Sequence, residues 1–343
     1  MIQRIRFLEK SLRQSCSNQI SRRTWLASAF LGVTGLSAAS PPAWSMQANG
    51  DDHSEADEIA SVQADAKKAG LEPFSHSQTD HFLGLGDASA RFRNDALEIC
   101  ESLQSDFLRY FSQKRGFKVT LPKKRLTVIT LMGTASYKAY TGEEPGPLDG
   151  GHYDLDTNRL VMFDFRPNGE GPDVVANPER VNRLALVHET THLLCYNTGL
   201  LSRQANVPLW VSEGLATHVE LWQNKRSRIG EPNRLWITFL NDARKNLNDA
   251  RKNGTAWVPI ADLVASDKSF DDKKTAELSQ AESWLMVHYL LKTQQQLPKF
   301  RAYLAGLQTD EAATNRVEYV EKHLGSLKNL DRELVRHLKR VSR

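Results

Sequence analysis

The sequence predicts an α+β protein, in which a small N-terminal mixed sheet with helices is followed by a mainly helical C-terminal part. Three observations support this fold class. The 343 residues are 40% hydrophobic and 25% charged, as in ordinary globular proteins, so the chain can bury a sizeable core. The strands that composition and periodicity predict all precede residue 177. After that residue, apolar side chains recur at helical spacing.

The distribution of charge argues against a nucleic-acid partner. The formal net charge is +4, but residues 1–45 carry six basic side chains and one acidic one. The rest of the chain, with 39 basic and 40 acidic side chains, is close to neutral. A near-neutral body has no electrostatic footprint for a phosphate backbone or an anionic lipid surface.

The N-terminus is typical of an export signal. Arg22 and Arg23 are followed by a weakly apolar stretch at 26–39 and then by two prolines. This pattern resembles a twin-arginine (Tat) signal peptide at 1–45, which implies the Tat export machinery as a partner and a periplasmic or extracellular mature chain from about Met46. The apolar stretch is too short to span a bilayer, so we expect no membrane span in the mature chain.

The residues after this signal divide into a linker and one folded domain. Residues 46–79 are polar and acidic without apolar periodicity, and we expect a polar linker or a frayed helix there. The domain is predicted at 80–343, with a sheet-bearing part at 80–176 and a helical part at 177–343. In the first part we expect a short strand, a long helix, a second strand, one or two helical turns and a Gly/Pro-rich loop, at 81–85, 90–111, 126–131, 135–140 and 142–151.

A run of oxygen-bearing side chains follows this loop. Residues 154–158 alternate Asp, Asp and Asn in the manner of a calcium loop, but the glycine and the distant glutamate of such loops are missing. Turn chemistry instead favours a hairpin turn that leads into a strand at 159–165.

The helical part begins with clear capping signals. Asn177 offers a capping side chain, Pro178 suits the first helical position, and Glu179 places an acid in the first turn. We expect this helix to run to about residue 197, with Gly199 as its left-handed cap.

Inside this helix, the motif HETTH predicts a metal site. His188 and His192 are four residues apart, so both imidazoles lie on one helix face and reach one ion, with Glu189 beside the open coordination position. Catalytic zinc commonly has three protein ligands and a water, so a third ligand is expected downstream. Pro208 opens a second predicted helix that carries Glu213, and the intervening loop lets the two helices pack antiparallel. His188, His192 and Glu213 suit one Zn²⁺ per chain.

The pair HETTH and LWVSEGLA resembles the signature of gluzincin metallopeptidases, in which HExxH is followed by a Trp-x-x-Glu-Gly-x-Ala motif. More closely, residues 80–343 resemble the exported bacterial proteins called peptidase MA-like. This resemblance implies a zincin-like fold, with zinc on His188, His192 and Glu213. It also implies an antiparallel edge strand before the metal-binding helix, on which the substrate lies, and the strand at 159–165 is the candidate.

Together these residues predict an exported zinc metallopeptidase. Zinc would bring the pKa of a bound water toward 7, and Glu189 would act as general base and then pass the proton to the leaving amine. The substrate would be a peptide or a protein, with endopeptidase and exopeptidase activity both open. Two alternatives stay open: a non-catalytic zinc-binding module of the cell envelope, and hydrolysis of a non-protein amide or ester.

One departure from the family pattern favours the non-catalytic alternative. Related peptidases carry a downstream Tyr that stabilises the tetrahedral intermediate, and Gln280 occupies the matching position here. His218, His288 or Tyr289 would replace this donor if the geometry allowed, although packing on a buried helix is the better explanation for His288 and Tyr289.

The cysteines do not form a disulfide framework. Cys16 lies in the expected signal peptide, which leaves Cys100 and Cys195. We expect two buried thiols, with a single bridge left open. Cys195 lies one turn beyond His192, but a small buried residue is favoured there over a metal ligand.

Overall fold

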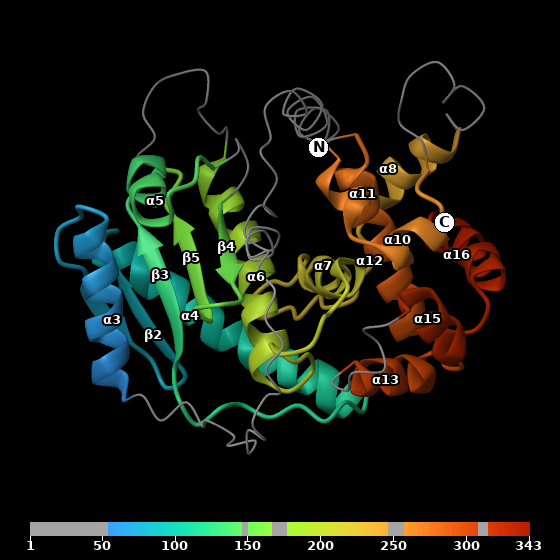
Figure 1. Cartoon of the computed structure of the whole chain (residues 1–343), viewed down its shortest axis with the longest axis horizontal. Coiled ribbons are helices and arrows are strands. Elements are labelled where there is room, and N and C mark those ends of the chain that lie inside the picture. Colours follow the sequence, from blue (N-terminus) through green and yellow to red (C-terminus); the bar gives the residue numbers. More distant parts are fainter. Residues whose placement is uncertain (1–53, 146–149, 167–176, 246–256, 273, 308–314) are drawn as a thin grey trace, which may run out of the picture.

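A computed structural model describes residues 54–145, 150–166, 177–245, 257–272, 274–307 and 315–343. The expected signal peptide lies outside these residues. The fold class is α+β as predicted, with a five-stranded mixed sheet followed by helices (Figure 1). The elements up to the end of the sheet are α3 (Glu55–Lys68), β1 (Ser75–Gln78), β2 (Phe82–Gly86), α4 (Ala90–Leu108), the π-helix η2 (Arg109–Lys114), β3 (Leu126–Leu131), α5 (Thr134–Thr141), β4 (Gly151–Asp154) and β5 (Arg159–Phe163). The helices after the sheet are α6 (Pro178–Asn197), α7 (Leu209–Val219), α8 (Arg234–Lys245), α10 (Ile260–Ala265), α11 (Lys268–Asp271), α12 (Ala276–Lys292), α13 (Leu297–Gly306), α15 (Arg316–Leu324) and α16 (Leu327–Val341).

The sheet has the strand order β1-β2-β3-β5-β4, with β2, β3 and β5 parallel and the two outer strands antiparallel. The three parallel strands are buried along their whole length, which explains their continuous apolar sequence. Alternation sends Val128 and Leu160 to the face covered by α4 and α6. Ile129 and Val161 point to the opposite face, toward α3 and α5.

Most of the predicted local elements are confirmed. The strands expected at 81–85 and 126–131 are β2 and β3, and the helical turns expected at 135–140 are α5. The helix expected at 90–111 is α4, which continues as η2. The expected hairpin turn joins β4 to β5, and there the Asp156 N–H donates to Oδ1 of Asp154 at 2.9 Å.

Of the two possibilities for 46–79, a polar linker or a frayed helix, the described part contains a helix, α3, and also the strand β1, so the linker prediction is wrong there. A capping box between Ser54 and Asp57 starts α3, which buries little more than Val62 and Ala66. So small an apolar contact gives no periodic signal.

Polar contacts with distant residues hold α3 instead. Nε of Arg159, on β5, donates to Glu58 at 2.8 Å, and Nη1 of the same guanidinium donates to Asp65 at 2.7 Å. The side chain of Gln63 also exchanges two hydrogen bonds with the backbone of Phe74. The acidic side chains of this segment suggested a solvated linker, but some of them bind Arg159, about 100 residues away on β5.

The expected position of the edge strand is also wrong. The strand predicted at 159–165 is β5, which lies inside the sheet between β3 and β4. The antiparallel edge strand is β4, four residues long with the sequence GHYD, in the segment where the sequence favoured the end of a loop. So short and polar a strand carries no apolar alternation to reveal it.

Among the helices after the sheet, α12 is buried on nearly all sides and packs against α7, α8, α11, α13 and α16. In Figure 1, α6 and α7 lie between the sheet and these remaining helices. Among the described residues, no helix combines the length and the hydropathy that a bilayer span requires.

Candidate metal centre

Helix α6 presents two histidines on one face. As the sequence predicts, the Asn177 side chain accepts from the N–H of Arg180 to cap this helix, and Gly199 follows its C-terminus with a positive φ of 81°. One turn separates His188 from His192, and their Nε2 atoms lie 3.2 Å apart. Both side chains are buried, with 7% of His188 and 10% of His192 exposed.

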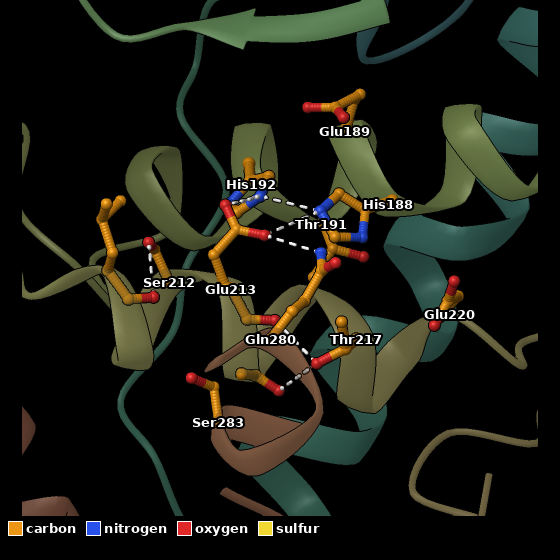
Figure 2. A network of polar contacts seen from close by, with 12 residues as sticks. His188, Glu189, Thr191, His192, Ser212, Glu213, Thr217, Glu220, Gln280 and Ser283 are labelled. Carbon is orange, nitrogen blue, oxygen red and sulfur yellow. Dashed lines mark hydrogen bonds and ion pairs between the residues drawn. The ribbon is translucent and has the colours of Figure 1, made fainter. Parts of the chain in front are cut away.

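Helix α7 brings a carboxylate to the same place. It begins after Pro208 and packs against α6, so Glu213 faces the two histidines (Figure 2). Oε2 of Glu213 lies 3.4 Å from Nε2 of His188, and Oε1 lies 3.6 Å from Nε2 of His192. Among the described residues, these three form the one group of His, Cys, Asp or Glu side chains whose ligand atoms all lie within 4.8 Å of one another.

These separations fit a tetrahedral metal ion. Ligand atoms at zinc distances and tetrahedral angles lie about 3.3 Å from one another. The separations in the cluster are close to this value: 3.2 Å between the two Nε2 atoms, 3.4 Å from Nε2 of His188 to Oε2 of Glu213, and 3.6 Å from Nε2 of His192 to Oε1 of Glu213. Two neutral imidazoles and one carboxylate are also the donor set of zinc sites that keep an open coordination position. The cluster therefore has both the spacing and the chemistry to hold zinc.

The carboxylate of Glu189 lies beside the cluster and contacts the edge strand. Its Oε2 accepts from the backbone N–H of Tyr153, on β4, at 2.9 Å. Within the β4–β5 pair, Phe163 N–H donates to Gly150 O, so the backbone of Tyr153, three residues on, points away from β5. In Figure 2, Glu189 and Gln280 lie on opposite sides of the cluster.

Gln280, which occupies the position of the family's Tyr, lies next to the three-residue cluster. It comes from α12, and its Nε2 donates to Oε2 of Glu213 at 3.1 Å. The substitute donors that the sequence offered lie elsewhere. His218 bonds to Tyr110 at 2.8 Å, and His288 bonds to a histidine of α16, so both belong to a separate buried group.

The sequence analysis missed two tyrosines beside the cluster. Tyr196 follows His192 by four residues on α6 and stacks on Tyr153, with 5.6 Å between ring centroids and 18° between ring planes. The Tyr196 hydroxyl interacts with Ser212 and lies close to Glu213. Burial raises the pKa of both phenols, so they stay protonated. The repeat of the four-residue spacing from 188 to 192 to 196 was the signal that would have revealed Tyr196.

Both described cysteines are free, buried thiols, as expected, and neither joins the cluster. Cys100 lies 3.3 Å from the Thr190 hydroxyl, and burial raises the pKa of its thiol to about 12. Burial also raises the pKa of Cys195, which is 1% exposed and packs in the core. A buried protonated thiol is neither a nucleophile nor a ready metal ligand.

Comparison with known proteins gives one result. A family model described as "Protein of unknown function (DUF1570)" matches residues 183–311. The match begins inside α6 and continues past α13, so it contains the three-residue cluster and Gln280 but not the sheet. No curated protein matches the chain.

Proposed function

We propose that this chain is an exported zinc-dependent metallopeptidase with a zincin-like fold. One Zn²⁺ per chain would bind His188, His192 and Glu213, and Glu189 would be the general base. The observation that carries the proposal is the convergence of three ligand side chains, from two helices, with nitrogen and oxygen atoms 3.2 to 3.6 Å apart. The resemblance of the HETTH and LWVSEGLA segments to gluzincins supports the same assignment.

The roles of the chain's own residues follow from their positions. Bound zinc would supply a Lewis acid that activates a water and polarises the carbonyl to be hydrolysed. Glu189 would accept the proton of the attacking water and deliver it to the leaving amine, so each peptide bond consumes one water. The N–H of Tyr153 holds the Glu189 carboxylate in one orientation, as a general base requires.

The edge strand supports a peptide as substrate. Strand β4 has one neighbour, β5, and the backbone of Tyr153 faces the other way, toward Glu189. An extended peptide that adds to this edge would pass its backbone beside the general base. A peptide or protein segment in extended form is therefore the substrate class that the site favours.

The location of the protein is proposed from the sequence. The arginine pair at 22–23 and the apolar stretch after it support Tat export to the periplasm or beyond the cell. The near-neutral remainder of the chain supports a protein substrate over a nucleic acid.

The test compares metal content and cleavage of a peptide library between the purified mature chain and Glu189→Gln. Glutamine keeps the size and the acceptor for the Tyr153 N–H but cannot take a proton. We expect about one zinc per chain in both proteins and cleavage only in the unsubstituted one. A Glu213→Ala protein that folds should lose the metal.

Other outcomes decide against parts of the proposal. Zinc in both proteins without peptide cleavage, and with hydrolysis of a non-peptide amide or ester, would assign another substrate class. Zinc without any hydrolysis would favour the non-catalytic envelope module. Unchanged zinc in Glu213→Ala would overturn the ligand assignment.

A further inference from the structure

The carboxylate of Glu213 accepts a hydrogen bond from a neutral amide on another helix. Gln280 lies in the second turn of α12, 67 residues after Glu213, and its Nε2 is 3.1 Å from Oε2 of Glu213 (Figure 2). An ionised carboxylate only accepts hydrogen bonds, so the contact fixes which end of the amide faces it. The amide nitrogen donates and does not bind a metal, so Gln280 acts on the ligand and not on the ion.

A close approach of two helices makes this contact. Gly214 follows Glu213 on α7, and a Cβ placed on it would lie 2.7 Å from the backbone oxygen of Ser283 and 2.5 Å from Cγ2 of Val287. Ser283 lies one turn after Gln280 on α12. Any side chain at position 214 would push α12 away and draw the amide off the carboxylate. The Glu-Gly pair therefore couples the ligand to the helix that carries its hydrogen-bond donor.

We propose that Gln280 is a positioning residue that holds the Glu213 carboxylate in the orientation in which it would bind the metal. This inference rests on the proposed metal centre. Oε2 of Glu213 accepts from this amide and lies 3.4 Å from Nε2 of His188, while Oε1 lies 3.6 Å from Nε2 of His192, so the hydrogen bond keeps both oxygens turned toward the histidines. A carboxylate held in this orientation beside two imidazoles would complete the set of three protein ligands that catalytic zinc commonly has. Gln280 thus has a function at the position where related peptidases carry a Tyr.

The experiment removes the donor and keeps the volume. Gln280→Met has nearly the same length and packs in a helix, but donates nothing. Ser283→Ala is the matched control. It removes a polar group one turn along the same helix, and the Ser283 hydroxyl donates to Ser279 O. Zn²⁺ affinity is measured by competition with a chromophoric chelator, and Co²⁺ loading by visible absorption. Thermal unfolding of the metal-free proteins verifies that each variant folds.

We expect Gln280→Met to bind Zn²⁺ about 10- to 100-fold more weakly than the unsubstituted chain and Ser283→Ala to bind it equally well. The visible absorption of Co²⁺-loaded Gln280→Met should differ from that of the unsubstituted chain, since the amide no longer holds the Glu213 carboxylate in one orientation. An unchanged affinity and spectrum in Gln280→Met would overturn this inference and leave the metal centre in place. Failure of the unsubstituted chain to bind Zn²⁺ would instead overturn the proposed function.

Discussion

The part of the chain that the structure describes contains two groups of buried histidines, and their surroundings give them different chemistry. In the first group, two rings on one helix face share a carboxylate that a third helix holds in place. In the second group, three rings from three helices meet one another and a phenol. We call them the metal cluster (His188, His192 and Glu213) and the histidine core (His218, His288 and His337).

The histidine core lacks the features of a ligand site. His288 Nδ1 lies 2.8 Å from His337 Nε2, and His218 Nε2 lies 2.8 Å from the Tyr110 hydroxyl. Nδ1 of His218 and Nδ1 of His337 have no hydrogen-bond partner among the described residues, and the His288 ring interacts with the Gly230 backbone. Burial lowers the pKa of His218 well below its ordinary value, that of His288 to about 3 and that of His337 to about 4. Burial alone therefore does not make a histidine a metal ligand. The metal cluster differs in that a carboxylate lies beside both imidazoles.

The largest expected effect is on Zn²⁺ affinity, which a substitution in the metal cluster should lower and a substitution in the histidine core should not. His192→Ala removes a ligand, and we expect its Zn²⁺ affinity to fall by more than the ~100-fold that loss of an outer hydrogen-bond partner costs. His288→Ala should keep one Zn²⁺ per chain, because it touches no ligand. Metal analysis after dialysis measures both. Loss of zinc in His288→Ala at retained folding would mean that the histidine core takes part in metal binding.

The next effect is on stability against acid. In the folded chain His288 and His337 have lowered pKa values, so below about pH 6.5 the unfolded chain binds protons that the folded chain does not. The free energy of unfolding should therefore fall as the pH falls, by roughly 2 kcal/mol for each of the two between pH 7 and 5. Urea unfolding with EDTA present measures this without the metal.

A double variant attributes this loss to the histidine core. His288→Phe with His337→Phe replaces the bonded pair by apolar rings, so neither ring titrates. We expect the fall in stability between pH 7 and 5 to shrink by at least half. An equal fall in the double variant would assign the acid sensitivity to other groups.

A substitution in α7 should change both stability and Zn²⁺ affinity by a smaller amount. This helix carries Glu213 of the metal cluster and His218 of the histidine core. Gly214→Ala places a methyl against the backbone of α12, and overpacking of this kind costs about 1–3 kcal/mol. Zn²⁺ affinity should also fall, as it does in Gln280→Met. Urea unfolding and chelator competition measure the two. A stability loss without a metal effect would separate helix packing from ligand positioning.

The same two groups show what could be predicted from the sequence. The metal cluster was predictable because four residues of helix fix the relation of His188 to His192, and capping signals locate both helices. The histidine core was not, because its contacts join residues 108 and 49 apart in the chain. The contact between Gln280 and Glu213 spans 67 residues, and the docking of Glu58 on Arg159 spans 101. Local periodicity carries no information on such pairs.

The smallest expected effect tests whether the histidine core influences metal binding, through a substitution at Tyr110. Tyr110→Phe removes the hydroxyl that bonds to His218 and leaves that ring with no partner at either nitrogen. An orphaned buried polar atom costs about 1–2 kcal/mol, so the urea midpoint should fall modestly. Zn²⁺ affinity should not change, since His218 lies more than one turn beyond Glu213 and does not contact the ligands. A change in zinc affinity in Tyr110→Phe would show that the two groups are coupled through α7. The histidine core would then contribute to metal binding, although less than the ligands themselves.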